Sequence, residues 1–162
     1  MTRRSRAREV ALQLLFQRYH NPQVSRQAVD RFLRQRLREP ELVPFCQALY
    51  DGVVAHLGEI DAQLGQAAEN WRLIRMAGVD RNVLRIGAFE ILHMPDTPTS
   101  VALDEAIELA RRFGSADSPK FVNGVLDKLR VNAEKGAEPD AASAKPPSEV
   151  EDASAETLTP DS

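Results

Sequence analysis

Apolar residues recur at helical spacing from residue 3 to residue 133, and the β-branched clusters that are typical of strands are missing. The pattern predicts an all-α fold of about six or seven helices, separated by loops short enough for neighbours to pack largely antiparallel. We expect a compact bundle of two helical subgroups. The predicted helices cover residues 3–19, 25–38, 44–64, 80–94, 100–114 and 118–130, with a short further segment at 71–76.

Capping and breaking residues set these boundaries. Ser25 is a suitable N-cap for the second helix, and Asp80 is a suitable N-cap for the fifth segment, whose apolar residues cover most of its circumference as a central helix requires. The third helix would continue for about six turns, with Gly52 and Gly58 as places of close packing or bending. Gly114 stands where a helix C′ residue is expected.

Residues 134–162 differ in composition from the rest of the chain. They carry eight acidic side chains against Lys135 and Lys145 and almost no large apolar residue, so they cannot bury enough surface to offset the ordering of their backbone. We therefore divide the chain into a folded domain, 1–133, and a disordered acidic tail, 134–162. Two interpretations of the tail stay open: a solvated segment, or a mimic of nucleic acid that competes for a basic face.

The opposite end of the chain is basic. Residues 1–38 contain ten arginines against Glu9 and Asp30, although the whole chain has a net charge of −3. A polyanion is a reasonable partner for such a surface. An arginine bias can also arise from a GC-rich genome, so the count alone is weak evidence.

The first helix places its charges unevenly. Its apolar stripe centres on residues 7, 11 and 14, which puts Arg6 and Glu9 on the outside, Arg4 and Arg8 at one flank, and Phe16 off the stripe. Arginines that neutralise phosphates beside an aromatic ring that stacks on a base are typical of single-stranded RNA binding. The alternative is that Phe16 packs under the second helix and the arginines are merely solvated.

A second candidate region is the connection before the last helix. Phe113 and Phe121 flank a turn that holds Asp117 and Lys120. The backbone N–H groups at the start of the last helix would favour an anion, and Asp117 could accept a hydrogen bond from a base edge. The alternative is that both phenylalanines belong to the core.

Several classes of chemistry are not predicted. The chain has no Gly-rich phosphate loop, no nucleophile beside a plausible base, and a single cysteine, Cys46, which we expect to be buried. The three histidines are not at ligand spacing, so no metal and no cofactor are predicted. Asp104, Glu105 and Glu108 fit a helix N-terminus better than a catalytic site. Without a signal sequence or an apolar span, we expect a cytoplasmic protein that does not enter membranes.

Three blocks of sequence resemble the NusB family of bacterial transcription antitermination factors. They are RRSRAREVALQLLF, DRNVLRIGAFEIL and VALDEAIELARRFGSADSPKFVNGVLDKL, and the resemblance covers about residues 3–130. It implies an all-helical fold of two subdomains, no catalytic activity, and binding of boxA RNA in ribosomal RNA leader transcripts. It also implies a heterodimer with NusE, a small-subunit ribosomal protein, that joins other Nus factors on RNA polymerase.

The resemblance also assigns residues. It implies RNA contacts at Arg4, Arg6, Arg8 and Phe16 on the first helix and at Phe113, Asp117, Lys120 and Phe121 around the last turn, and NusE contacts at Asp80 and Arg81. The chain departs from the family where Ser5 replaces a frequent arginine, Phe16 a tyrosine and Asp104 an asparagine. Some family members self-associate, and whether this chain is a monomer or a homodimer stays open.

Overall fold

Helices make up the architecture of the computed structural model, which describes residues 3–68 and 76–136. Within these ranges there are seven helices and no strand, as predicted. The helices are α1 (Arg3–His20), α2 (Arg26–Arg36), α3 (Leu42–Ala55), α4 (Leu57–Ala67), α5 (Gly78–His93), α6 (Thr99–Phe113) and α7 (Ser118–Gly136). The predicted segment at 71–76 lies outside the described residues except for Met76, and so does the predicted tail from residue 137 onward.

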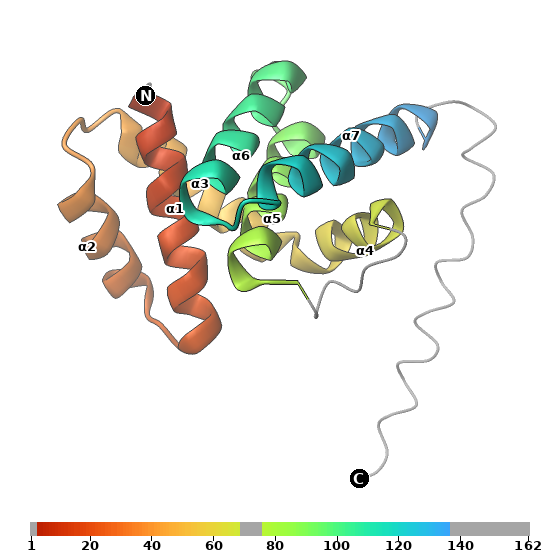
Figure 1. The fold of residues 1–162 in the computed structure, drawn as a ribbon. Coiled ribbons are helices and arrows are strands. Elements are labelled where there is room, and N and C mark those ends of the chain that lie inside the picture. Colours follow the sequence, from red (N-terminus) through yellow and green to blue (C-terminus); the bar gives the residue numbers. More distant parts are fainter. Residues whose placement is uncertain (1–2, 69–75, 137–162) are drawn as a thin grey trace, which may run out of the picture. The chain divides into compact units, whose positions relative to one another are not determined.

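The chain divides into two units, Met1–Arg130 and Val131–Ser162. Within the first unit, α5 is the central helix, because it contacts α1, α3, α4 and α6 (Figure 1). The helices α1, α2 and α3 pack on one another as one group, while α4 and α6 join α5 in the other. One continuous cluster of buried apolar side chains runs through both groups, so the two subgroups share a core.

The predicted third helix is interrupted. His56 leaves helical geometry, with φ −110° and ψ 22°, and separates α3 from α4. Its imidazole Nδ1 lies 3.0 Å from the carbonyl oxygen of Gly52, which already accepts the backbone N–H of His56. Gly52 is a place of close packing, because a Cβ there would lie 2.0 Å from the Phe89 ring. The predicted single helix of about six turns is therefore two helices, with the close packing that was expected at Gly52.

Three helix ends also differ from prediction, and one of them is the end of α7, which continues to Gly136, so residues 134–136 of the predicted tail are helical. The fifth helix begins at Gly78 with Ala77 as its N-cap, so Asp80 lies in the first turn and is not the cap. Gly114 does end α6, but its φ of −98° is not left-handed. Glycine is required there because a Cβ would lie 2.5 Å from the Ser118 hydroxyl, which accepts a hydrogen bond from the Ser115 N–H. The predicted cap of α2 is confirmed, since the Ser25 hydroxyl accepts the Ala28 N–H.

A buried ion pair joins α1 to α5. The Arg8 guanidinium donates two hydrogen bonds to Glu90, Nε to Oε1 at 2.8 Å and Nη2 to Oε2 at 2.7 Å, and both side chains are almost fully buried. Glu105 on α6 lies 3.5 Å from Arg8 Nη1 and accepts the Ser5 hydroxyl at 2.6 Å. The first two turns of α1 are thus fixed to α5 and α6 through charges inside the protein.

Removing one member of this ion pair should lower the stability of the fold far more than removing both. We expect Arg8→Met to lower the free energy of unfolding by about 3–5 kcal/mol, because Glu90 is left as an unpaired buried charge. Arg8→Met combined with Glu90→Leu should recover most of that loss. Urea unfolding of the three proteins, with Arg4→Met as an exposed control, measures this. A double variant no more stable than Arg8→Met would contradict it.

Gly52 and Gly58 provide a matched test of close packing. Gly52→Ala should cost about 1–3 kcal/mol because the new methyl group overlaps the Phe89 ring. Gly58→Ala adds a methyl group where no atom lies within 4 Å, so it should be neutral or stabilising by up to about 1 kcal/mol. Thermal unfolding of both variants checks the difference in sign.

Candidate nucleic-acid interface

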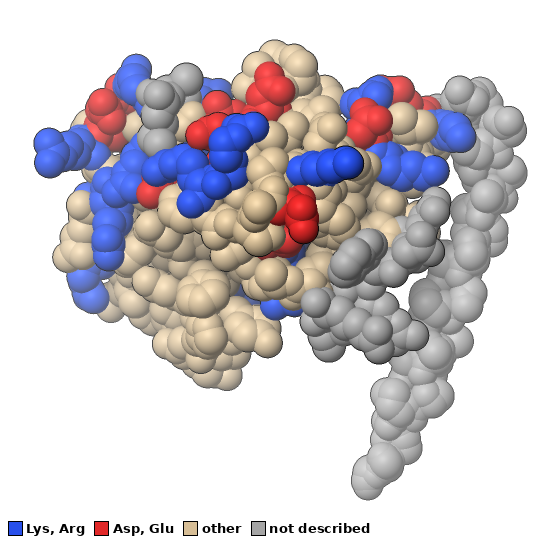
Figure 2. All heavy atoms as spheres, in the orientation of Figure 1, with Lys and Arg blue, Asp and Glu red and all other residues tan. Residues whose placement is uncertain are grey.

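The exposed arginines of α1 form the first part of the candidate interface. Arg4 is exposed and its guanidinium lies over the Phe45 ring, 4.5 Å from the centroid, while the Arg6 side chain is 38% exposed. Arg3 pairs with Glu39 and Glu41. Lys and Arg side chains gather over α1 and α2 in Figure 2, as the charge distribution predicts. Arginine held in this way presents a positive surface to phosphates.

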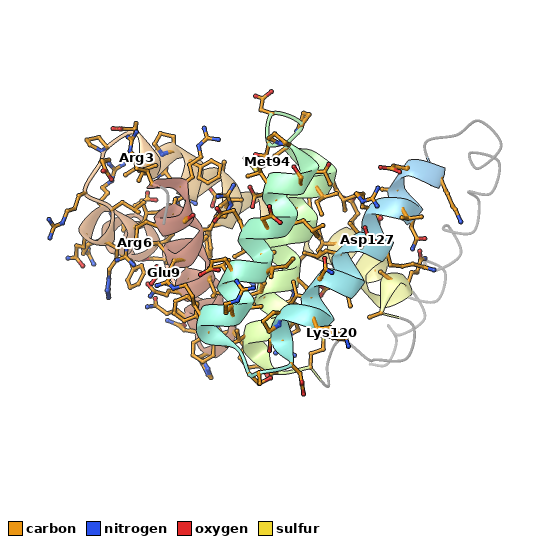
Figure 3. The ribbon with its side chains drawn as sticks, turned by 45° about the horizontal axis from the view of Figure 1, so that its top comes forward. Arg3, Arg6, Glu9, Met94, Lys120 and Asp127 are labelled. Atoms are coloured by element: carbon orange, nitrogen blue, oxygen red, sulfur yellow. The ribbon has the colours of Figure 1, made fainter. Side chains whose placement is uncertain are left out.

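Arg8 and Glu9 are not where the helical pattern places them. Arg8 was expected at a flank, but it is buried against Glu90, so it is not available to a phosphate. Glu9 was expected on the outside, but it is 8% exposed and lies between Arg6 at 3.1 Å and Arg112 at 3.3 Å. A helical wheel drawn for α1 alone cannot show that α5 and α6 cover Arg8 and Glu9. Figure 3 shows Arg3, Arg6 and Glu9 in succession along α1.

A groove brings the two predicted aromatic positions together. Phe16 on α1, 48% exposed, and Phe113 at the end of α6, 37% exposed, both line a hollow of about 390 Å³. Its other walls come from α1, α2 and the start of α5, and are formed by Leu12, Gln13, Gln17, Phe32, Arg36, Val79 and Asn82. Exposed rings beside arginine are able to stack on flat aromatic ligands. The alternative that Phe16 packs under α2 and is hidden is wrong.

Two residues of this region were missed by the sequence analysis. Tyr19 is 65% exposed and lies one turn after Phe16, and that spacing was a signal that could have identified it. Gln13 has a buried Oε1 with no hydrogen-bond partner among the described residues, in the wall of the groove. A buried acceptor of this kind favours a ligand that donates a hydrogen bond. Nothing in the local sequence indicates it.

A second hollow, of about 280 Å³, lies where α5 begins and α7 begins. It is lined by Met76, Ala77, Asp80, Ser115, Asp117, Ser118 and Phe121. Asp117 is exposed, and Phe121 is half-buried and packs against the core, while Lys120 is exposed and lies at the start of α7 in Figure 3. The Oδ1 atom of Asp80 is buried without a hydrogen-bond partner among the described residues.

The first turns of α5 form a wall of both hollows. Val79 and Asn82 line the first, while Asp80 lines the second. Arg81, between them in sequence, donates to the Met76 carbonyl at 3.3 Å and lies over the Tyr19 ring at 5.3 Å. The structure thus brings Phe16 with Phe113, and Asp80 with Asp117 and Phe121. Arg4 lines neither of these hollows.

Other reactive groups lie away from this face. Burial raises the pKa of the Cys46 thiol to about 12, with a smaller contribution from the charge of Asp51. His56, Glu59 and His93 have ligand atoms that lie within 4.8 Å of one another and could hold a metal ion. The histidine spacing gave no sign of this group, because His56 and His93 meet only through the packing of α4 on α5. None of the helices in the described part of the chain has both the length and the apolar character that crossing a bilayer requires.

Comparison with known proteins places this arrangement in a class of small, all-helical transcription antitermination proteins. The chain belongs to the NusB family, whose family model matches residues 5–130. A relative named transcription antitermination protein NusB from Sorangium cellulosum (strain So ce56) is 45% identical over 132 residues, which cover 82% of this chain and 94% of the relative. The protein of the same name from Bacillus subtilis (strain 168) is 41% identical over 133 residues, which cover 82% and 98%.

Solved structures agree with the fold. A structure of T. maritima NusB is 34% identical and superposes with a TM-score of 0.70 over 80% of this chain and 91% of that one. A crystal structure of antitermination factors NusB and NusE in complex with double-stranded RNA has a TM-score of 0.73 at 22% identity, over 82% and 98% of the two chains. At that identity the likeness shows the shared fold alone.

The buried Cys46 thiol should react very slowly in the folded protein. With its pKa near 12 against an ordinary 9.0, Cys46 holds roughly a thousandfold less thiolate at pH 8 than an exposed cysteine, and its sulfur is covered. We expect modification by a disulfide reagent at pH 8 to be slower by at least that factor in buffer than in denaturant. Equal rates in the two solvents would show that the thiol is accessible.

Proposed function

We propose that this protein is a transcription antitermination factor that binds boxA RNA of ribosomal RNA leader transcripts together with NusE. The observation that carries the proposal is the groove between α1 and α6, in which Phe16 and Phe113 are exposed beside Arg36. Membership of the NusB family supports it. In this role the protein acts with other Nus factors on RNA polymerase to suppress premature termination.

The arginines and the phenylalanines of this face would have different roles in RNA binding. Arg4 and Arg6 lie at the N-terminal half of α1, where they would neutralise phosphates and supply affinity without regard to sequence. Phe16 and Phe113 lie further along, where splayed bases would stack on their rings. Arg8 is excluded from this role by its burial, so the phosphate contacts of α1 number one fewer than the sequence suggests.

The residues that line the second hollow would form hydrogen bonds with the edges of RNA bases. Asp117 is exposed there as an acceptor, and Asp80 Oδ1, which has no hydrogen-bond partner among the described residues, lines the same hollow. Lys120 and Phe121 follow at the first turn of α7, whose N–H groups favour a phosphate. RNA that occupies both hollows would cross the start of α5.

Asp80 and Arg81 are the proposed contacts to NusE. They lie in the first turns of α5, where Arg81 also rests on the exposed Tyr19 ring. A protein partner at this place would lie beside both hollows and would complete their walls. The existing hydrogen bond from Arg81 to Met76 holds that side chain in position in advance.

The remaining parts of the proposal follow from the family. The protein would act without catalysis or a cofactor, in the cytoplasm where bacterial transcription takes place. The RNA-binding domain would comprise residues 1–133, and the acidic tail 134–162 would be accessory to it. The monomeric or homodimeric state of the free protein is a property to be measured alongside RNA binding.

Binding of a boxA oligonucleotide and a scrambled control, with and without NusE, tests the proposal. Phe16→Ala should weaken boxA binding by about 1–3 kcal/mol because a stacking surface is lost. Arg6→Ala should weaken it and reduce the slope of log affinity against log salt by about 0.7, as one phosphate contact is lost from a single strand. Val101→Ala and Arg111→Ala are controls, since both side chains are exposed and line neither hollow.

Each outcome has a distinct meaning. Selective boxA binding that tightens with NusE supports the proposal, and unchanged affinity in both Phe16→Ala and Arg6→Ala contradicts the assigned face. The competing function is a protein scaffold with negligible RNA affinity of its own. Loss of NusE binding in Asp80→Lys, with no RNA binding by any variant, would favour that scaffold.

A further inference from the structure

A group of two histidines and one glutamate lies at the opposite end of α5 from the two hollows. His93 is the last residue of α5, next to Met94, which Figure 3 labels. At about 1.5 Å per residue, the 16-residue helix places His93 roughly 22 Å from Gly78. His56 and Glu59 come from the break between α3 and α4 and from the first turn of α4. This group is therefore separate from both hollows.

The donor atoms of these three side chains converge. Their ligand atoms lie within 4.8 Å of one another, and the His56 and His93 rings are 4.3 Å apart between centroids. Both imidazoles also contact the Phe89 ring, which gives the group an apolar wall. Two imidazole nitrogens and one carboxylate oxygen are a ligand set that Zn²⁺ accepts, with a fourth position left to solvent.

Each histidine shows a feature that a zinc ligand needs. His56 Nδ1 lies 3.0 Å from the Gly52 carbonyl oxygen, so the tautomer that donates there leaves the Nε2 lone pair available. Metal-binding histidines characteristically use their second nitrogen in this way. The Nε2 atom of His93 is buried and has no hydrogen-bond partner among the described residues. A buried nitrogen without an aligned hydrogen bond, beside a carboxylate, is in a position to bind a cation.

The geometry between His93 and Glu59 favours two ligands of one ion. His93 Nε2 lies 3.2 Å from Glu59 Oε1, close enough for an ion pair but not aligned as a hydrogen bond. Two ligand atoms at about 2.0–2.1 Å from Zn²⁺ at a tetrahedral angle are roughly 3.3 Å apart.

From this convergence we propose that His56, Glu59 and His93 form a Zn²⁺ site that ties the break between α3 and α4 to the end of α5. The bound ion coordinates the Nε2 atom of His93 and fixes the α3–α4 joint.

Calorimetric titration of ZnCl₂ into the chelator-treated full chain tests the site, with thermal unfolding as a second readout. We expect one Zn²⁺ per chain and a rise in Tm, because the ion binds the folded state. His93→Gln and Glu59→Gln should each weaken zinc binding at least tenfold and abolish the rise in Tm. His20→Gln, which alters an exposed histidine at the end of α1, should change neither.

Two results would overturn the proposal. One is the absence of zinc binding by the unaltered chain, in which case His93 and Glu59 form only an ion pair. The other is zinc binding that both His93→Gln and Glu59→Gln retain, which would mean that other groups hold the ion. Glu59→Gln changes an exposed side chain, so it keeps the test valid even where a histidine variant folds poorly. Unchanged boxA affinity in these variants separates this result from any failure of the RNA assignment.

Discussion

The bidentate ion pair between Arg8 and Glu90 is the constraint on which the rest of the structure depends. It lies where α1 crosses α5, and both charges are removed from water, so only close to ideal geometry offsets their desolvation. A hydrophobic contact tolerates sliding and rotation, whereas two parallel hydrogen bonds define the rotation of α1 about its axis and its position along α5. That rotation decides which arginines reach solvent and where Phe16 emerges. The proposed RNA face is thus a consequence of an interaction that itself has almost no contact with solvent.

The same arrangement gives the arginines of α1 different tasks. Arg8 is structural, whereas Arg6 remains at the surface beside Glu9, which it shares with Arg112 of α6. Glu9 therefore acts as an internal counterion that holds two basic side chains from different helices in place. A phosphate that approaches them meets groups that are already ordered, and it competes with a carboxylate rather than with free ions. The count of arginines in the sequence overstates the positive charge that this face presents.

Properties of single helices were predictable from the sequence, and properties of their junctions were not. Periodicity gave the helical class and the central position of α5, and the Ser25 cap and the exposed Phe16 were recognisable from local spacing. The burial of Arg8 was not, because its partner is 82 residues away, although a glutamate inside an otherwise apolar helix was an available hint. The break at His56 depends on a carbonyl four residues earlier and on Phe89 from another helix. The two hollows are likewise made by elements that meet only after folding.

The position of α5 between the two hollows has a thermodynamic consequence. Its first turns supply Val79 and Asn82 to one cavity and Asp80 to the other, so an occupant of either cavity restricts the same short stretch of helix. Ordering that is completed when one hollow is filled is not required again when the other is filled, so the two hollows would be filled cooperatively. Such coupling is reciprocal: the factor by which a protein partner increases the affinity for RNA equals the factor by which RNA increases the affinity for that partner. One turn of helix would then be sufficient to couple the proposed RNA contacts to the proposed protein contact.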